Sequence, residues 1–280
     1  MASRCIVVRR TPKAYQARHW FHRIGKLPLI DFLREACKHY KLEASAIYCL
    51  TGAMREWPPP VSSEEELYQC LKEDGYLLPL PTESAALANI IEVSLVKYLV
   101  TQLNTLPNTQ AWGGSTRAYP DIVVSGEAFD KGHHAVDIKV ARRSANRKRI
   151  VNAISLLTGN TFFLHDLLFP GMDILYSEYR SHIDVLVVYT FDNASYTHVV
   201  DPELIAHETW RLASVVRSSS TREYIGSVTS LQRLRDGQGD FASMEEFLKY
   251  WKQPEKFKKV SATTLRQAQE RTKNRSGRLF

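Results

Sequence analysis

Residues 118–143, AYPDIVVSGEAFDKGHHAVDIKVARR, contain two apolar runs separated by a short polar segment. Both runs are rich in β-branched residues, and the segment between them, Asp130–Gly132, has the composition of a turn. This arrangement is typical of two β-strands joined as a hairpin. The pattern therefore predicts strands at Tyr119–Ser125 and Ala135–Ala141.

Three charged residues lie on or beside these strands. Side chains two positions apart on a strand point to the same side, so Asp137 and Lys139 share one face, which Asp121 can join from the first strand. Two carboxylates supply hard oxygen ligands for Mg2+, which can stabilise charge on a phosphate and lower the pKa of a bound water. A neighbouring lysine can orient or deprotonate that water. The triplet indicates metal-dependent phosphodiester hydrolysis; the alternative is an exposed hairpin that carries surface charges.

The rest of the chain predicts an α/β (α+β) fold. With 44% hydrophobic and 24% charged residues over 280 positions, the composition is that of a chain with a conventional core. Apolar residues at helical spacing predict helices over Leu27–Tyr40 and Thr82–Leu106. The almost wholly apolar run Asp184–Phe191 is expected to be a strand buried on both faces. Ser243 and Glu246 have the spacing of a capping box that opens a further helix.

Charge and cysteine usage narrow the class of protein. The net charge of +7 and the pI near 9.2 favour an anionic partner such as nucleic acid. The four cysteines are widely spaced without a CxxC pair, which indicates neither a zinc site nor a disulfide framework. Residues 1–13 carry charge where a signal peptide has its apolar core, and no uncharged run of about 18 residues is predominantly apolar. We expect an intracellular protein that does not span a membrane, in the cytoplasm of a prokaryote or the nucleus of a eukaryote.

Three separated segments resemble one known family. The segments are AYPDIVV…HAVDIKVARR, SSSTREYIGSV (residues 218–228) and DGQGDFASMEEFLKYW (residues 236–251). They are similar to the type II restriction endonucleases of the EcoRV type, in the PD-(D/E)xK nuclease superfamily. The resemblance implies a restriction-endonuclease-like core with a mixed central sheet flanked by helices. It also implies a homodimer that uses Mg2+, with Mn2+ as a substitute, to cut double-stranded DNA and leave 5′-phosphate and 3′-hydroxyl ends.

The resemblance also assigns roles to residues of the site. Asp121 and Asp137 would be metal ligands, and Lys139 would be the base that positions the attacking water, or its acid partner. Glu92, in the predicted helix, has the separation from Asp121 at which the family carries a further active-site glutamate. It is therefore a fourth catalytic and metal-binding candidate. The alternative is a solvated helix charge, although the neighbours Ile91 and Val93 are apolar.

Two loops are candidates for contact with DNA. In the family, one loop enters the major groove and another, just before the PD motif, follows the minor groove. By position these are Ser218–Tyr224 and Gly114–Tyr119, the latter in the expected loop Asn108–Ala118. The DNA-binding candidates in them are Ser115, Thr116, Arg117, Ser218, Ser219, Ser220, Thr221, Arg222 and Tyr224. Arg222 has the chemistry for a bidentate contact to guanine; a serine-rich surface turn explains the same composition.

The predicted recognition loop departs from the family pattern. The paired glycine and asparagine of the family are replaced by Ser218-Ser219-Ser220-Thr221-Arg222-Glu223. The family's target sequence therefore does not carry over, and sequence-specific cutting is itself open.

A run of basic residues follows the second strand of the hairpin. Arg142, Arg143, Arg147 and Lys148 lie within seven positions of one another, and Arg149 comes next. The common alternative for such a run is a solvated surface. Directly after the triplet, contact with the phosphate backbone of DNA is the expected role.

The N-terminal part is expected to form a module over residues 1–81, followed by the nuclease domain over residues 82–280. Its order of elements resembles ubiquitin-like β-grasp domains of the CIDE type, which pair with one another. The alternative is a dimerisation element of the nuclease family within Leu29–Pro60. Either possibility provides a surface for a protein partner; simple completion of the core is the competing explanation.

Two other functions stay open beside a site-specific endonuclease. One is a non-specific or regulated DNase under control of the N-terminal module. The other is a non-catalytic DNA-binding protein on a nuclease scaffold, against which the intact Asp121, Asp137 and Lys139 argue.

Overall fold

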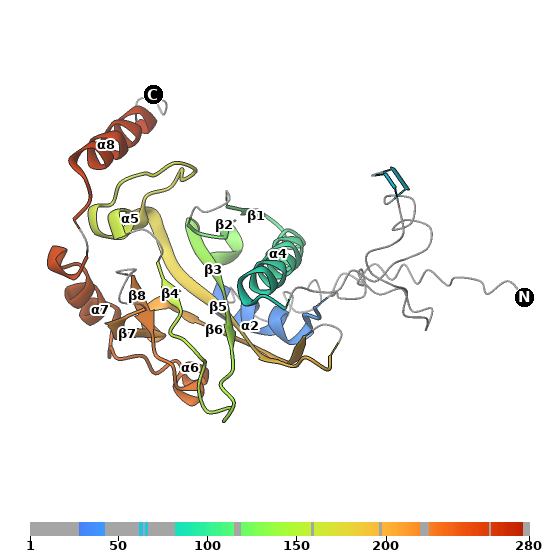
Figure 1. Cartoon of the computed structure of the whole chain (residues 1–280). Coiled ribbons are helices and arrows are strands. Elements are labelled where there is room, and N and C mark those ends of the chain that lie inside the picture. Colours follow the sequence, from blue (N-terminus) through green and yellow to red (C-terminus); the bar gives the residue numbers. More distant parts are fainter. Residues whose placement is uncertain are drawn as a thin grey trace, which may run out of the picture.

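The computed structural model describes residues 28–42, 62–63, 65–66, 82–114, 119–157, 160–195, 198–218, 224–257 and 259–276 (Figure 1). Most of the expected N-terminal module, residues 1–81, therefore lies outside the described residues. The same holds for most of the elements on which its resemblance to a β-grasp domain rests. Within that module, only the helix expected over Leu27–Tyr40 is described at length. The helix, α2, spans Leu29–His39.

A mixed five-stranded sheet forms the centre of the molecule, in the order β1-β2-β3-β5-β6. The strands β3 and β5 are parallel, and every other neighbouring pair is antiparallel. The strands are β1 (Thr109–Gly113), β2 (Ile122–Gly126), β3 (His133–Arg142), β5 (Tyr179–Phe191) and β6 (Val199–Glu208). The predicted mixed α/β core flanked by helices is thus confirmed.

The hairpin predicted from residues 118–143 is formed by β2 and β3. The two strands pair from Ile122 opposite Val136 to Ser125 opposite His133. The 3₁₀ turn η3 (Glu127–Phe129) and the left-handed residue Asp130 connect them. The strand predicted over Asp184–Phe191 lies inside β5, which pairs with β3 on one side and with β6 on the other.

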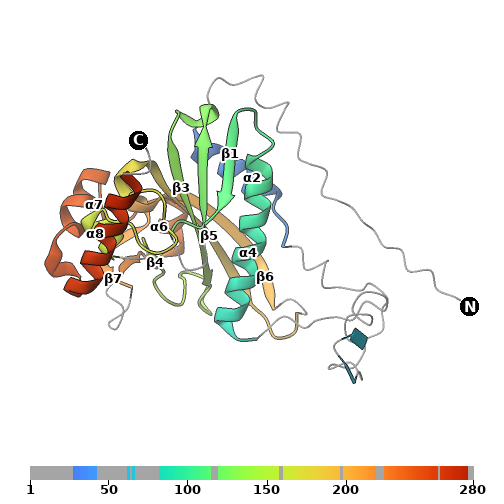
Figure 2. The same ribbon diagram turned by 90° about the horizontal axis from the view of Figure 1, so that it is seen from above.

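Two helices cover one face of this sheet (Figure 2). They are α2 and α4 (Ser84–Leu103), whose start is capped by Glu83 through the amides of Ala85 and Ala86. Their buried side chains form the first core with the apolar residues on that face of β2, β3 and β5. By length and composition α4 is the one helix in the described ranges that could cross a membrane. It packs against the sheet with one side, as a core helix does.

The opposite face of the sheet carries a second core. It is built from a three-stranded sheet in the order β4-β8-β7 and from the C-terminal helices. The elements on this side are β4 (Ser155–Leu156), α5 (Asn160–His165), η4 (Tyr176–Glu178), η5 (Thr209–Arg211), β7 (Ala213–Arg217), β8 (Ile225–Ser227), α6 (Leu231–Asp236), α7 (Met244–Trp251), η6 (Pro254–Lys256) and α8 (Ala262–Ser276). Trp251 and Phe247 of α7 are almost fully buried in this core.

The capping box predicted before α7 is present in part. The Ser243 hydroxyl accepts a hydrogen bond from the amide of Glu246, as an N-cap does. The Glu246 carboxylate bonds to the amide of Ala242, one position earlier than in the standard box.

One prediction about local structure was wrong. Residues 109–113, which were expected to lie in a loop because of their composition, form the edge strand β1 against β2. These residues become a strand because their backbone pairs with β2. Their side chains alternate as in a strand, with Thr109 and Ala111 buried and Gln110 exposed. Such alternation over five residues is short and is easily hidden by the neighbouring glycines.

Candidate active site

Asp121 lies immediately before β2, where that strand meets β3. Its Oδ2 accepts a hydrogen bond from the amide of Ile138 at 2.5 Å. The carboxylate is thereby held beside the middle of β3. Its chain neighbours at odd positions, Tyr119 and Val123, belong to the second core, so Asp121 projects to that side of the sheet.

Asp137 and Lys139 project from β3 to the same side. Ala135 and Ala141, which share their strand parity, are also buried in the second core. The Nζ of Lys139 lies 2.5 Å from Oδ2 of Asp137, and the side chains are only 17% and 3% exposed. Lys139 is thus the charged partner of Asp137 Oδ2, and no backbone amide among the described residues donates to that oxygen. The structure thus brings Asp121, Asp137 and Lys139 together.

The electrostatics of the triplet reflect this proximity. Burial, and then the charge of Asp137, raise the pKa of Asp121 to about 8, against the opposing effects of Lys139 and the Ile138 amide. Burial lowers the pKa of Lys139, but the carboxylates of Asp137 and Asp121 outweigh burial and raise it above its ordinary value. Lys139 is therefore a cation in this arrangement, and Asp121 has a strong tendency to bind a proton or a metal ion.

Glu92 approaches the triplet from the other side of the sheet. It is half-buried on α4, where Ile91 and Leu95 face the first core and Val93 is exposed. Burial raises the pKa of Glu92, while Lys139 lowers it and Asp137 raises it. Glu92 therefore lies within range of both charges. In the described part of the chain, no hydrogen bond or ion pair joins it to the triplet.

The residues present suit a divalent cation of the hard type. Asp121 and Asp137 are close enough to repel each other, and Asp137 Oδ2 is a buried oxygen whose charged partner is Lys139. Carboxylate oxygens are the ligands that Mg2+ and Mn2+ prefer. Among the described residues, no three His, Cys, Asp or Glu side chains are arranged to hold one metal ion. The two aspartates are thus the core of the candidate metal site.

One charged residue at the site was missed by the sequence analysis. Asp184 of β5 is the cross-strand neighbour of Asp137 and is 1% exposed. Its only sequence signal was the presence of an acid at the head of an otherwise apolar run. That signal acquires meaning only when the parallel pairing of β3 with β5 is known.

The ends of the two candidate DNA loops lie beside the second core. The amide of Gly114 donates to the carbonyl of Asp121 at 2.8 Å, and a Cβ at Gly114 would lie 2.0 Å from the Pro120 carbonyl oxygen. This closes the base of the first loop next to the triplet. Ser115, Thr116 and Arg117 within it lie outside the described residues.

The second loop joins β7 to β8. Its base is closed by a 2.9 Å hydrogen bond from the amide of Ser218 to the carbonyl of Tyr224. The hydroxyls of Ser218 and Ser155 are 2.7 Å apart. Ser218 is therefore held by the second core, while Ser219, Ser220, Thr221 and Arg222 lie outside the described residues.

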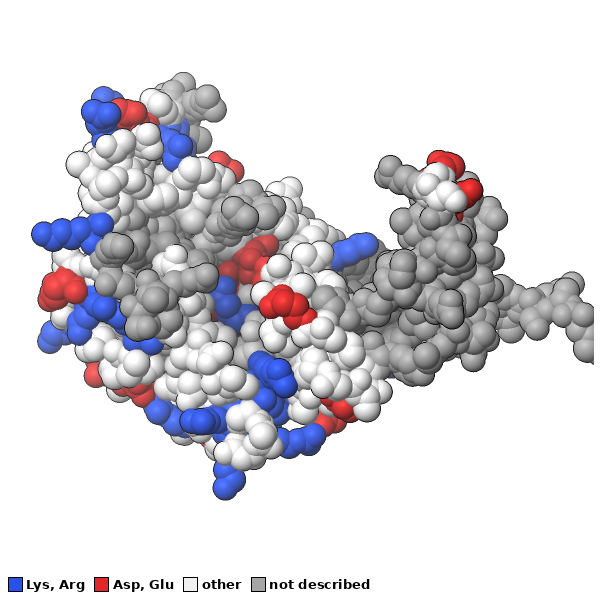
Figure 3. Space-filling view, viewed as in Figure 1, with Lys and Arg blue, Asp and Glu red and all other residues white. Residues whose placement is uncertain are grey.

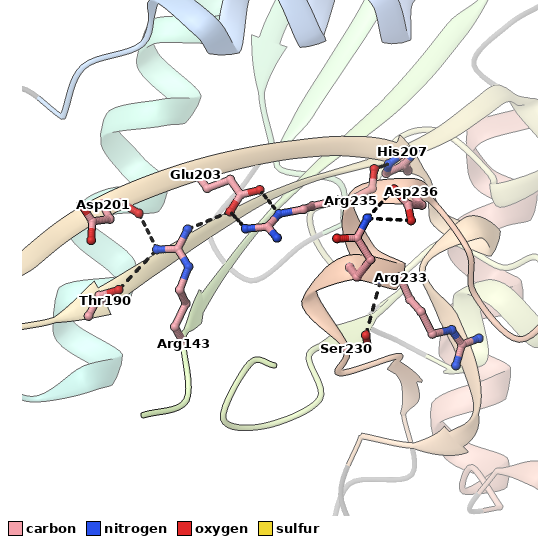
Figure 4. Close-up of polar contacts among 10 residues, drawn as sticks. Arg143, Thr190, Asp201, Glu203, His207, Ser230, Arg233, Arg235 and Asp236 are labelled. Atoms are coloured by element: carbon pink, nitrogen blue, oxygen red, sulfur yellow. Dashed lines mark hydrogen bonds and ion pairs between the residues drawn. The ribbon is translucent and has the colours of Figure 1, made fainter. Parts of the chain in front are cut away.

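The basic run after β3 divides into bound and exposed side chains. Arg143 is largely buried and joins Glu203, whose second partner is Arg235 (Figure 4). The nitrogen–oxygen distances are 2.8 Å from Arg143 and 2.6 Å from Arg235. Arg143 also donates to the carbonyl of Asp201. The Arg143 guanidinium thus links β3 to β6 and α6 within the protein.

The other members of the run are more accessible. Arg142 is exposed, with its guanidinium carbon 4.4 Å from the centre of the Phe191 ring. Arg147 pairs with Asp201 at 3.1 Å, but both side chains are about 60% exposed. Lys148 is exposed. Acidic side chains gather near the middle of the face shown in Figure 3, with lysine and arginine along its lower margin.

His134 and the described cysteine, Cys37, have structural surroundings. His134 lies 2.9 Å from the Ser181 hydroxyl and 2.5 Å from the Phe129 carbonyl, and Cys37 is buried in the first core.

Comparison with known protein families gives one match. Residues 54–274 match the family described as restriction endonuclease EcoRV. The match spans most of the chain, from before α4 to the last turn of α8, and includes every described residue of the candidate site. No protein with a curated description matches the chain.

Proposed function

The chain belongs to the EcoRV restriction endonuclease family, and we propose that this DNA endonuclease is a Mg2+-dependent enzyme that hydrolyses both strands of duplex DNA. The observation that carries the proposal is the convergence of Asp121, Asp137 and Lys139 on one face of the sheet. Charged groups of this kind are rarely buried together without a partner. A divalent cation between two carboxylates, and a phosphate beside the lysine, would supply that partner.

Asp121 and Asp137 would hold the metal ion, and Glu92, which lies within electrostatic range of Asp137 and Lys139, stays a candidate catalytic and metal-binding residue. A bound Mg2+ polarises a phosphoryl oxygen and lowers the pKa of a coordinated water. The Ile138 amide keeps the Asp121 carboxylate oriented toward β3, which reduces the reorganisation needed when the ion enters. Mn2+ is expected to replace Mg2+ because it accepts the same oxygen ligands.

Lys139 would act on the water and the phosphate. Its raised pKa favours the ammonium form, which can orient the attacking water and balance negative charge that develops on the scissile phosphate. Its position 2.5 Å from Asp137 keeps it at the metal-binding carboxylate. The reaction would leave 5′-phosphate and 3′-hydroxyl ends, as the family resemblance implies.

DNA would be held by the two loops and by the exposed basic side chains. Lys148, Arg142 and Arg147 are accessible for phosphate contacts, which position a duplex without reading its sequence. The loops, closed at Gly114 and at Ser218, start beside the triplet and the second core. Major-groove contact by Ser218–Tyr224 and minor-groove contact by Ser115, Thr116 and Arg117 remain part of the proposal.

We propose a homodimer, as the family resemblance implies, in which two sites of this kind would each cut one strand of the duplex. An intracellular location, expected from the cysteine usage and the charged N-terminal residues, is also part of the proposal. The division into an N-terminal module at residues 1–81 and a nuclease domain at residues 82–280 is also proposed, with the module as the surface for a protein partner.

A second candidate keeps the chemistry and changes the specificity. The serine-rich sequence of residues 218–221 departs from the family's recognition loop, which favours cleavage that is non-specific or selective for DNA structure. Sequencing the ends of fragments cut from a random DNA library separates the two candidates. A single consensus supports a site-specific type II enzyme, and scattered ends support the regulated or non-specific DNase.

Cleavage of plasmid DNA by the full-length protein tests the proposed chemistry. We expect the parent to cut in Mg2+ and Asp137→Ala to lose activity on the order of 1000-fold, because several kcal/mol of charge stabilisation depend on the ion it holds. Asp130→Asn is the matched control, since it removes a carboxylate from an exposed position of the same hairpin. Equal rates for the parent and Asp137→Ala would overturn the proposal.

A further inference from the structure

Asp184 is a buried carboxylate for which the proposed reaction has no role. The residue is 1% exposed, and no donor among the described residues meets either carboxylate oxygen with full hydrogen-bond geometry. The hydroxyl of Thr209, in the turn that follows β6, donates to the carbonyl of His182 at 3.3 Å and also lies close enough to Asp184 to lower the pKa of its carboxyl. Within the described residues, only Asp137 and Asp184 are carboxylates buried to this degree.

The sheet places Asp184 beside the metal-binding candidates. Asp184 of β5 is in register with Asp137 of the parallel strand β3, and neighbouring strands lie about 4.8 Å apart. In-register residues of a parallel pair point to the same face. Leu186 and Val188, which share the strand parity of Asp184, are buried in the second core, so Asp184 points to the face that carries Asp137 and Lys139.

A carboxylate at this position is costly for the fold. Leu186 and Val188 show that an apolar side chain would pack well on this part of β5, whereas a buried carboxylate without hydrogen bonds loses its hydration. Lys139 is the cation that reaches it, and Lys139 is already paired with Asp137. Burial, and then Asp137, raise the pKa of Asp184 to about 7, while Lys139 lowers it. The face therefore holds three carboxylates against one ammonium group.

We propose that Asp184 is an auxiliary carboxylate of the divalent-ion site and strengthens cation binding by Asp121 and Asp137. The proposal rests on the proposed function, because it assigns the ion to that pair of aspartates. Asp184 adds negative charge beside Asp137, which favours a bound cation. It also attracts Lys139, the ammonium group that competes with the ion for Asp137. It is a positioning residue, since no three such side chains in the described part of the chain are arranged around one ion.

Titration of the full-length protein with Mn2+, followed by calorimetry at pH 8, tests this role without a cleavage assay. We expect Asp184→Asn and Asp184→Leu each to bind Mn2+ about 10–100-fold more weakly than the parent, as changes behind a metal ligand do. Asp130→Asn, which removes an exposed carboxylate from the β2–β3 hairpin, is the matched control and should bind as the parent does.

Thermal unfolding without metal supplies the second measurement. Asp184→Leu should unfold on the order of 5 °C higher than the parent, because an apolar side chain replaces an unpaired buried carboxylate. Mn2+ affinity equal to the parent's in either folded variant overturns the role of Asp184 and leaves the proposed nuclease function intact. Failure of the parent itself to bind Mn2+ overturns both.

Discussion

Asp121 is both a candidate metal ligand and a carboxylate whose burial disfavours its charged form. Its carboxylate is largely buried near Asp137, and the hydrogen bond from the amide of Ile138 does not offset the effects that raise its pKa. At neutral pH the metal-free site therefore favours a protonated Asp121. A divalent ion bound by Asp121 would displace that proton, so binding of the ion and deprotonation of Asp121 would be coupled.

The coupling predicts how metal affinity depends on pH. Because the pKa of Asp121 is raised to about 8 in the folded protein, protons compete with the ion below pH 8 and cease to compete above it. Mn2+ affinity should rise up to about tenfold per pH unit from pH 6 and level off near pH 8. Calorimetric titrations across this range measure the slope, and an affinity independent of pH would contradict the raised pKa.

The site residues were predictable to different degrees. Asp121, Asp137 and Lys139 could be grouped from strand alternation because the spacing of two residues determines a shared face. Glu92 required a family resemblance, since nothing in the helix sequence relates it to β3. Asp184 could not be predicted, because its proximity to Asp137 arises from a parallel pairing between strands that are far apart in sequence.

At the scale of elements, β3 and the loop after it combine two tasks. The strand carries the site, and the basic run that follows it both ties β3 to its neighbours and offers charge to a ligand. Arg143 performs the first task through Glu203 and Asp201. Lys148 is exposed and is available for the second.

Substitutions in this run should therefore have separate effects. Lys148→Ala should weaken DNA binding and reduce the dependence of log affinity on log salt by about 1, the loss of one phosphate contact. Arg143→Ala should mainly lower the free energy of unfolding, by about 1–3 kcal/mol, because the bonds of Arg143 to Glu203 and Asp201 are lost while Glu203 keeps Arg235. Salt-dependent binding and urea denaturation measure the two effects. An unchanged salt slope in Lys148→Ala would exclude its phosphate contact.

The long elements were easier to predict than the short ones. Helix α4 and strand β5 were predicted because each carries a long apolar pattern that burial enforces. The five residues of β1 were mistaken for loop because their pairing with β2, rather than their composition, makes them a strand. The small sheet of β4, β7 and β8 is assembled from strands of two, five and three residues, too short to give a clear period.

At the scale of the whole molecule, the sheet separates two cores with different tasks. The first, under α2 and α4, is apolar and supports the sheet from behind. The second, under α5 to α8, shares its face with the triplet and with the bases of both candidate DNA loops. Helix α2 belongs to the first core although it lies in the expected N-terminal module, so at least this helix completes the core of the nuclease fold.

Loss of α2 should consequently destabilise the nuclease core. Leu33 is fully buried in it, and Leu33→Ala should lower the free energy of unfolding by about 2–5 kcal/mol. Removal of residues 1–81 should have a larger effect. Lys38→Ala, at an exposed position of the same helix, is the control. Denaturation midpoints of the parent and Leu33→Ala that coincide would show that α2 does not support the core.

The central claim is that Asp121, Asp137 and Lys139 form the hydrolytic site of a Mg2+-dependent DNA endonuclease. The most direct test is the rate at which Lys139→Ala cuts supercoiled plasmid DNA in Mg2+, compared with the parent and with Lys249→Ala, an exposed lysine on α7. We expect Lys139→Ala to be about 10²–10⁴-fold slower, Lys249→Ala to match the parent, and chelation of Mg2+ to stop cleavage by all three. Cleavage by Lys139→Ala at the parent's rate would contradict the account.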